Sequence, residues 1–239
     1  MQTAFGFPQP LVERYRPQTI DAFVGIPQAK EAARAILDAP MPNSAFLFAG
    51  ESGLGKTALA LAIAKTLNAQ LHHIPARQAS REALDAVWES VQYAPWGNGW
   101  GHIVLVDEAD LARIDIQQGF LSLLDSTASL ANALFGDWRP CAPRVVWIFT
   151  TNADSATIWT DSRFEQRFLS RVRIVPFSNY GIQRELTDYL RVIWDAEIGT
   201  ESGDDSPDFR RIAKDLRGNV RACLMALEQE ITRRQYEAA

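Results

Sequence analysis

The chain has 239 residues, of which 47% are hydrophobic, and a formal net charge of -5 at pH 7. This length and composition suffice to bury a sizeable core, and the acidic balance excludes a protein coated in basic surface, although it leaves room for a local basic track. Two cysteines in no metal-ligand spacing (Cys141 and Cys223), no basic start before an apolar core, and no run of about 18 apolar residues predict a reduced, cytoplasmic protein without a membrane span.

Apolar runs alternate with helical patterns from about residue 28 to residue 177. We expect helices over 28–37, 56–67, 80–92, 116–127 and 163–168, and strands over 44–50, 70–76, 102–109, 144–152 and 172–177. Parallel neighbours need crossover connections, so this alternation predicts an α/β fold with a mostly parallel sheet covered by helices on both faces. The runs IVLV and VVWIF are apolar throughout, as strands buried on both faces are.

From Ser178 onward the pattern is helical only, with helices expected over 180–197, 207–218 and 219–239. Ser206-Pro207-Asp208 is typical of a helix start, and Gly218 is typical of a helix end. We therefore predict two domains, an α/β domain over residues 1–177 and a small all-helical domain over residues 178–239.

The octapeptide Gly50-Glu51-Ser52-Gly53-Leu54-Gly55-Lys56-Thr57 fits the pattern G-x-x-x-x-G-K-[ST] between a predicted strand and a predicted helix. Glycines let backbone N–H groups turn toward phosphate, and the helix N-terminus adds positive potential. Lys56 offers a charge to the outer phosphates, and Thr57 offers a hydroxyl to Mg²⁺. Residues 50–58, through Ala58, are thus predicted to bind ATP or GTP.

Two further strands end in polar side chains at the same predicted sheet edge, where ligands of open α/β sheets bind. We expect Asp107 to hold Mg²⁺, directly or through water, and Glu108 to polarise the attacking water as general base. The amide of Asn152 would orient water or touch the γ-phosphate. The alternatives are a solvated strand end for the two acids and a polar strand cap for Asn152.

These motifs together resemble those of AAA+ ATPases, and within them most of all the clamp-loader group, namely replication factor C small subunits and bacterial clamp-loader ATPases. The matching segments are ERYRPQTIDAFVG at 13–25, the P-loop, DEAD at 107–110, TTN at 150–152, FLSRVRIVPF at 168–177 and RGNVRACLMALEQ at 217–229. They follow the family's order over nearly the whole chain. The resemblance implies a P-loop NTPase sheet sandwiched by helices and followed by a helical lid domain, with ATP and Mg²⁺ as cofactors.

The resemblance also implies roles for single residues. The residues expected to flank the adenine are Tyr15, Arg16, Pro17, Val24 and Gly25. Asn152 matches sensor 1, and Arg221 matches the sensor-2 arginine that reports the γ-phosphate to the lid. Ser170-Arg171 matches the pair whose arginine enters the neighbouring subunit's site, so Arg171 is the expected arginine finger and Arg167 the alternative.

The chain departs from the clamp-loader pattern in three places. The resemblance ends with the lid, so we expect assembly to rest on the ATPase interfaces or on another protein rather than on a collar domain. Residues 128–143 are longer and more aromatic than the family's turn. They predict either a hairpin or loop that contacts a substrate through Phe135, Trp138 and Arg139, or a loop packed on its own aromatic residues. Gly25-Ile26-Pro27-Gln28 replaces the family's Gly-Gln and predicts an altered helix start.

The aromatic segment YAPWGNGWGH, at residues 93–102, precedes the strand that ends in the two acids. Trp96 and Trp100 would either contact a substrate or cap the core, because aromatic faces on a glycine-rich loop serve either purpose.

Three functions follow from these features. The first is an ATP-driven machine of the clamp-loader or helicase-loader kind, which closes a ring or spiral around DNA and to which Arg77 and Arg81 add local basic charge. The second is a remodeller of partner polypeptides. The third is a nucleotide-binding subunit that does not hydrolyse ATP.

Overall fold

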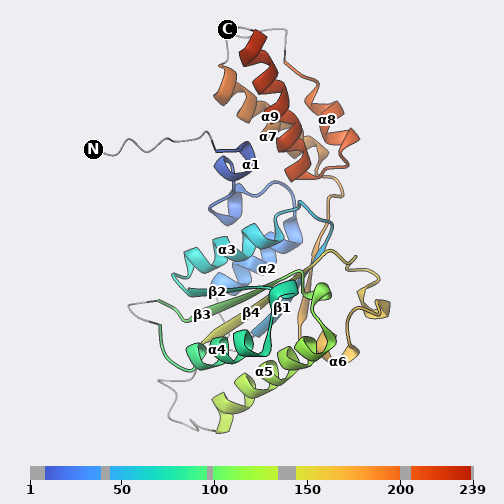
Figure 1. The fold of residues 1–239 in the computed structure, drawn as a ribbon. Coiled ribbons are helices and arrows are strands. Elements are labelled where there is room, and N and C mark those ends of the chain that lie inside the picture. Colours follow the sequence, from blue (N-terminus) through green and yellow to red (C-terminus); the bar gives the residue numbers. More distant parts are fainter. Residues whose placement is uncertain (1–8, 39–43, 96–98, 134–143, 200–205, 238–239) are drawn as a thin grey trace, which may run out of the picture.

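The structure, a computed structural model, describes residues 9–38, 44–95, 99–133, 144–199 and 206–237, with the backbone alone for 126–133 and 237. Within these ranges a parallel sheet is flanked by helices, and a group of helices follows it at the C-terminal end (Figure 1). The predicted α/β class with a helical C-terminal region is confirmed.

Five strands form the sheet in the order β2-β3-β4-β1-β5, and each neighbouring pair is parallel. Their bounds are β1 (Ser44–Gly50), β2 (Gln70–Pro75), β3 (His102–Asp107), β4 (Val145–Thr151) and β5 (Arg173–Phe177). Strand β1, the first in the sequence, therefore lies between β4 and β5. Because all neighbouring strands are parallel, the C-terminal ends of β1, β3 and β4 share one edge of the sheet. Ligands of open parallel sheets bind at such an edge.

The helices among the described residues are α1 (Leu11–Arg14), α2 (Pro27–Asp38), α3 (Lys56–Thr66), α4 (Arg81–Val91), α5 (Ile114–Ala133), α6 (Gln166–Leu169), α7 (Gln183–Ile198), α8 (Phe209–Asp215) and α9 (Val220–Glu237). Short 3-10 turns are η1 (Ile20–Ala22), η2 (Ala76–Gln78), η3 (Ala109–Leu111) and η5 (Ile158–Thr160). Among the residues that the structure describes, no helix is both long and apolar enough to cross a membrane.

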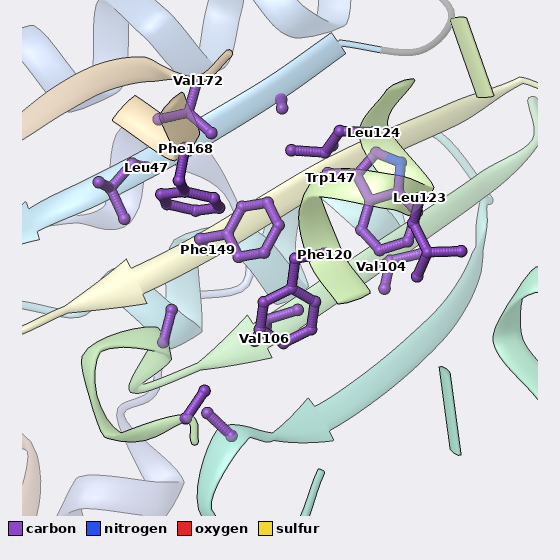
Figure 2. Close-up of a cluster of buried hydrophobic side chains, with 14 of the residues drawn as sticks. Leu47, Val104, Val106, Phe120, Leu123, Leu124, Trp147, Phe149, Phe168 and Val172 are labelled. Atoms are coloured by element: carbon purple, nitrogen blue, oxygen red, sulfur yellow. The ribbon is translucent and has the colours of Figure 1, made fainter. Parts of the chain in front are cut away.

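Successive residues of the central strands alternate between two hydrophobic clusters, one on each face of the sheet. In β1, Leu47 packs with α4, α5 and α6, whereas Phe46 and Phe48 pack with α2 and α3. Figure 2 shows the first cluster, where the rings of Phe149 and Phe168 meet edge to face with centroids 4.9 Å apart. Burial on both faces explains why these strands are apolar throughout.

Two helix starts follow from local capping chemistry. The backbone N–H of Ala83 donates to Ser80 Oγ at 3.2 Å, which begins α4, and the N–H of Arg211 donates to Asp208 Oδ1 at 3.0 Å, which begins α8. The helix start predicted at Ser206–Asp208 is therefore present.

Several predicted bounds need correction. Helix α5 continues to Ala133, so the first residues of the segment 128–143 extend a helix instead of opening a hairpin or loop. Their sequence, ASLANA, is rich in alanine and leucine, which favour a helix. Helix α6 begins at Gln166 rather than at 163, and α8 ends at Asp215 rather than at 218. The rest of the segment, with Phe135, Trp138 and Arg139, lies outside the described residues, as do Trp96 and Cys141.

The C-terminal helices share a third hydrophobic cluster, and Leu11 of α1 belongs to it. The N–H of Leu11 donates to Glu228 Oε1 of α9 at 3.0 Å, and the hydroxyl of Tyr15 donates to Glu197 Oε1 of α7 at 2.7 Å. The domain boundary near Phe177 stays a prediction. Helix α1 nevertheless packs on the helical group, although it precedes the sheet in the sequence (Figure 1).

Candidate nucleotide-binding site

The P-loop joins the C-terminal end of β1 to the start of α3 at Lys56. Two of its glycines leave no room for a side chain. A Cβ on Gly50 would lie 2.0 Å from the carbonyl oxygen of Phe177, and a Cβ on Gly53, where φ is +82°, would lie 2.1 Å from Asn219 Oδ1. The glycine pattern therefore serves close approach of β5 and α9 to the loop.

Lys56 is buried, with 7% of its surface exposed. Its Nζ donates to the carbonyl oxygens of Gly50 at 2.7 Å and Glu51 at 2.8 Å, and to Asn152 Oδ1 at 3.1 Å. Burial lowers the pKa of Lys56 to about 8, although the neighbouring carboxylate of Asp107 raises it. An anion in front of Lys56 would favour the charged ammonium, so the residue suits a phosphate ligand.

Three oxygen-bearing side chains meet beside the P-loop. The hydroxyl of Thr57 donates to Asp107 Oδ1 at 2.9 Å, and the hydroxyl of Thr150 donates to the same oxygen at 2.5 Å. Adjacent ligands of an octahedral Mg²⁺ with bonds of about 2.0–2.1 Å are themselves about 2.9 Å apart, so Thr57 and Asp107 fit this ion. In the described part of the chain no three His, Cys, Asp or Glu residues cluster as metal ligands, and Mg²⁺ needs only one or two carboxylates beside substrate phosphates.

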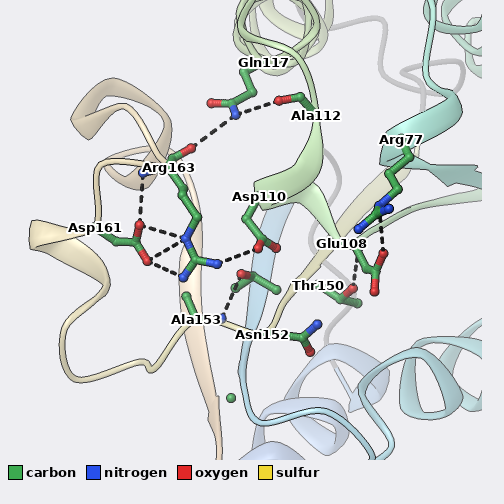
Figure 3. A network of polar contacts seen from close by, with 12 residues as sticks. Arg77, Glu108, Asp110, Ala112, Gln117, Thr150, Asn152, Ala153, Asp161 and Arg163 are labelled. Carbon is green, nitrogen blue, oxygen red and sulfur yellow. Dashed lines mark hydrogen bonds and ion pairs between the residues drawn. The ribbon is translucent and has the colours of Figure 1, made fainter.

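Glu108 follows Asp107 in a left-handed conformation with φ of +57°, which is rare for a residue other than glycine. Its N–H donates to Thr150 Oγ1 at 3.0 Å, and this bond fixes the turn after β3. The carboxylate is about half exposed, and Oε2 lies 3.9 Å from Nε of Arg77 on η2 (Figure 3). The turn thus directs the candidate base toward solvent at the sheet edge, beside one arginine.

Asp110, the last acid of DEAD, has a different environment. Its side chain is 4% exposed, and Oδ2 accepts a hydrogen bond from Nη1 of Arg163 at 2.8 Å. The same guanidinium forms a fork with Asp161 (Figure 3). Arg163 therefore ties the turn after β3 to the segment that precedes α6. Sequence reasoning missed this arginine, since its partner lies 53 positions away.

A cavity of about 230 Å³ opens at this edge of the sheet. Its lining includes these predicted residues: Tyr15, Arg16, Pro17, Val24, Ser52, Gly53, Leu54, Gly55, Lys56, Thr57, Ala58, Asp107, Glu108, Asn152 and Arg221. The structure thus brings together five separate segments of the chain around a cavity that is somewhat smaller than the roughly 300–1,000 Å³ of typical small-molecule sites.

Three predicted binding residues, Gly25, Gly50 and Glu51, do not line the cavity but lie next to residues that do. Gly50 and Glu51 face Lys56 with their carbonyl oxygens, and the N–H of Gly25 donates to Glu185 Oε2 of α7 at 2.8 Å. Gly25 and Ile26 both have positive φ, and α2 begins directly after them at Pro27. That this helix start differs from the family's stays a prediction.

The sequence did not single out part of the apolar wall. Val12, Phe23, Tyr189, Val220 and Leu224 also line the cavity. The hydroxyl of Tyr189 donates to the carbonyl oxygen of Tyr15 at 3.0 Å, which joins α7 to the segment after α1. The helical spacing of Val220 and Leu224 gives both side chains one face of α9, and this is the signal that could have revealed them.

Arg221 and Arg171 occupy different places. Arg221 lines the cavity from the start of α9. Arg171 lies outside the cavity lining. Its Nε and Nη2 donate to the two carboxylate oxygens of Asp125 at 2.6 Å and 3.0 Å, and its Nη1 donates to the carbonyl oxygen of Arg167. Within a single chain Arg171 therefore pairs with α5 instead of lining the cavity, and the arginine-finger role stays a prediction.

Trp100 packs against the core cluster that α2 and α3 cover, and its backbone N–H donates to the carbonyl oxygen of Leu67 at 3.3 Å. It precedes β3, at the end of the sheet opposite to the P-loop. This environment favours the alternative in which Trp100 caps the core.

A family model described as "ATPase family associated with various cellular activities (AAA)" matches residues 46–174, more than half of the chain, and a TIP49 P-loop domain model matches residues 9–81. A replication factor C small subunit of Natronomonas pharaonis is 28% identical over 225 residues, covering 91% of this chain and 61% of the relative. A replication factor C small subunit 2 of Pyrobaculum islandicum is 29% identical over 150 residues, covering 57% and 46%. The chain thus spans about half to three fifths of these relatives' lengths.

Solved structures share the fold. The Thermotoga maritima RuvB Holliday junction branch migration motor has a TM-score of 0.65 at 20% identity, covering 90% of this chain and 64% of that one. Domain III of the Thermotoga maritima replication initiation protein DnaA has a TM-score of 0.62 at 16% identity, covering 92% and 90%. With the P-loop, the two acids after β3 and the polar end of β4 around one cavity, the family match shows that this chain belongs to the AAA ATPases.

Proposed function

We propose that the chain is an ATP-hydrolysing motor or switch that assembles into a ring or spiral and acts on DNA or a DNA-bound complex, as clamp loaders or helicase loaders do. The names of its relatives, a replication factor and a Holliday junction motor, support a DNA-related role. The observation that carries the proposal is the pairing of Arg77 with Glu108 beside the nucleotide cavity.

Each part of hydrolysis has a candidate residue. P-loop N–H groups and Lys56 would hold the phosphates, and Thr57 with Asp107 would hold Mg²⁺, which supplies charge neutralisation on the phosphate oxygens. Glu108 would accept a proton from the attacking water, and Asn152 would orient that water. Arg221 would contact the γ-phosphate from the lid, while Arg171 of a neighbouring subunit would complete the positive charge around it.

The contact between Arg77 and Glu108 links this chemistry to a polyanion. The Arg77 side chain is 72% exposed and carries a charge that a DNA phosphate would attract. The same guanidinium lies 3.9 Å from the Glu108 carboxylate and pairs with it. A phosphate that draws Arg77 away would release Glu108 from this ion pair, so DNA binding would accelerate turnover.

The test compares ATP turnover with and without primed duplex DNA at low salt, for the unchanged protein, Arg77→Ala and Arg34→Ala. Arg34 is an exposed arginine of α2 that pairs with Asp21 away from the cavity, and it serves as the matched control. We expect DNA to stimulate the unchanged protein and the control, and Arg77→Ala to lose that stimulation. Turnover that DNA leaves unchanged at low salt would contradict the proposal.

The remodelling alternative gains no support from the described residues of its two aromatic segments. Trp96, Phe135 and Trp138 lie outside the described residues, and Trp100 packs on the core.

A further inference from the structure

The carbonyl oxygens of the P-loop accept hydrogen bonds from the loop's own lysine and from the start of α9. The carbonyl oxygens of Gly50 and Glu51 accept hydrogen bonds from Lys56. The carbonyl oxygen of Ser52 accepts one from Nδ2 of Asn219 at 3.0 Å, and that of Gly53 accepts one from the N–H of Arg221 at 3.4 Å. The two carbonyl oxygens in the middle of the loop, those of Ser52 and Gly53, therefore have their hydrogen-bond partners in the lid.

The side chain of Asn219 carries out two tasks at once. Its Oδ1 accepts the N–H of Ala222 at 3.0 Å and so caps α9, while its Nδ2 reaches Ser52. The amide lies so close to the loop that a Cβ on Gly53 would be 2.1 Å from Oδ1. An amide carries its acceptor and its donor on two separate atoms, so it offers one to the helix and the other to the loop.

This contact orients the phosphate-facing side of the loop. In a planar trans peptide the carbonyl and the following N–H point in opposite directions. Holding the carbonyl oxygens of Ser52 and Gly53 toward α9 therefore turns the N–H groups of Gly53 and Leu54 the other way, and both residues line the cavity. The same helix start places Arg221 in the cavity lining.

We propose that Asn219 is a positioning residue that sets the P-loop and Arg221 relative to each other, so that affinity for the nucleoside triphosphate depends on the lid. The inference rests on the proposed binding of ATP at this site. A second tie supports it, because Nδ2 of Asn179, after β5, donates to Glu51 Oε2 at 3.0 Å and to the carbonyl oxygen of Arg217 at 2.7 Å.

The rival explanation is that Asn219 only caps a helix, and the lid provides a matched control for it. Asp208 caps α8 through one oxygen, in the same helical group. Asn219→Ser and Asp208→Ser each leave a good capping hydroxyl, but only Asn219→Ser removes a donor to the P-loop. Asn219→Asp is a second variant of nearly equal shape, which keeps the cap and sets a carboxylate oxygen against the carbonyl of Ser52.

The experiment measures the affinities of the full chain for ATP and ADP with Mg²⁺ by calorimetry, with thermal unfolding beside it. We expect Asn219→Ser to weaken the binding of ATP by about tenfold, as loss of one hydrogen bond would, and that of ADP less, while Asp208→Ser leaves both affinities unchanged. In an Arg221→Ala background the ATP-over-ADP difference caused by Asn219→Ser should vanish, because the two residues act as a unit.

Unchanged affinities in both Asn219 variants would overturn the inference, as would an equal loss in Asp208→Ser or full additivity with Arg221→Ala. If Asn219→Ser does not fold, Asn219→Asp decides by the same criteria. Absence of ATP binding by the unchanged protein would instead overturn the proposed function, so the two failures are distinguishable.

Discussion

Lys56 shows how burial and neighbouring charges adapt one side chain to a phosphate ligand. Burial lowers its pKa to about 8, so the free protein holds this lysine partly neutral above that pH. Bound phosphates would favour the ammonium and raise the pKa. Nucleotide binding above pH 8 should therefore take up a proton at Lys56, whereas well below pH 8 the group is already charged.

The resulting prediction concerns the pH dependence of affinity. Because the bound state holds more protons than the free state above pH 8, ATP affinity should fall as pH rises from about 8 to about 9. Calorimetry at about pH 9, in two buffers of different ionisation enthalpy, measures the proton uptake. Lys56→Arg, which stays charged, should show none of this uptake. Equal proton uptake in the variant and the parent would rule out Lys56 as the source.

Some single residues were predictable and others were not, for a physical reason. The P-loop, Asp107 and Asn152 lie at or directly after the C-terminal ends of strands, so local pattern and sheet topology together place them at one edge. Asn219 contacts Ser52 across 167 positions, and no local pattern encodes that contact. The catalytic roles of these residues stay predictions, which turnover measurements on their variants would test.

At the scale of elements, Arg163 joins the turn after β3 to the segment before α6. Its partner Asp110 is buried, with 4% of its side chain exposed, whereas Asp125, the partner of Arg171, is 57% exposed. Removing one member of a buried pair leaves a buried charge without a partner. Removing one member of an exposed pair leaves the other charge in contact with water, at little cost.

Arg163→Ala should therefore lower the free energy of unfolding by about 1–3 kcal/mol, since it leaves the Asp110 carboxylate without its guanidinium. Arg171→Ala is the matched control and should cost less than about 1 kcal/mol. Urea unfolding of both variants and the parent gives the comparison. Equal losses in the two variants would show that the Asp110 contact is no stronger than a surface pair.

Element existence was easier to predict than element ends. Strands β3 and β4 are apolar because both faces are covered, and that pattern is local. The extension of α5 to Ala133 was not predicted, because the aromatic and glycine residues later in 128–143 are typical of a loop. The packing of α1 on α7 and α9 was missed because four helical residues carry too little periodicity to reveal a distant partner.

At the scale of the whole molecule, the cavity lies between the sheet edge and the helical group, with walls from both. Movement of α7 and α9 would carry α1 with them, because Leu11 and Tyr15 are bonded to those helices. Arg171 is not among the residues that line the cavity of its own chain, and it pairs with Asp125. In the proposed shared site, Arg171 would instead enter the cavity of a neighbouring copy.

The measurement that tests this central claim most directly is a mixing experiment with two inactive variants. Glu108→Gln removes the base and should lower turnover by about 10²- to 10⁴-fold, and Arg171→Ala removes the arginine and should lower it by about 10³- to 10⁵-fold. In an equimolar mixture about a quarter of the interfaces would join an intact Glu108 site to an intact Arg171.

The account predicts that this mixture recovers turnover to about a quarter of the parent's, although neither variant is active alone. Repeating the mixture with Arg167→Ala in place of Arg171→Ala tests the alternative arginine. A mixture with Arg171→Ala that stays as inactive as its separate components, while the two variants still assemble with each other, would contradict a site shared between neighbouring copies.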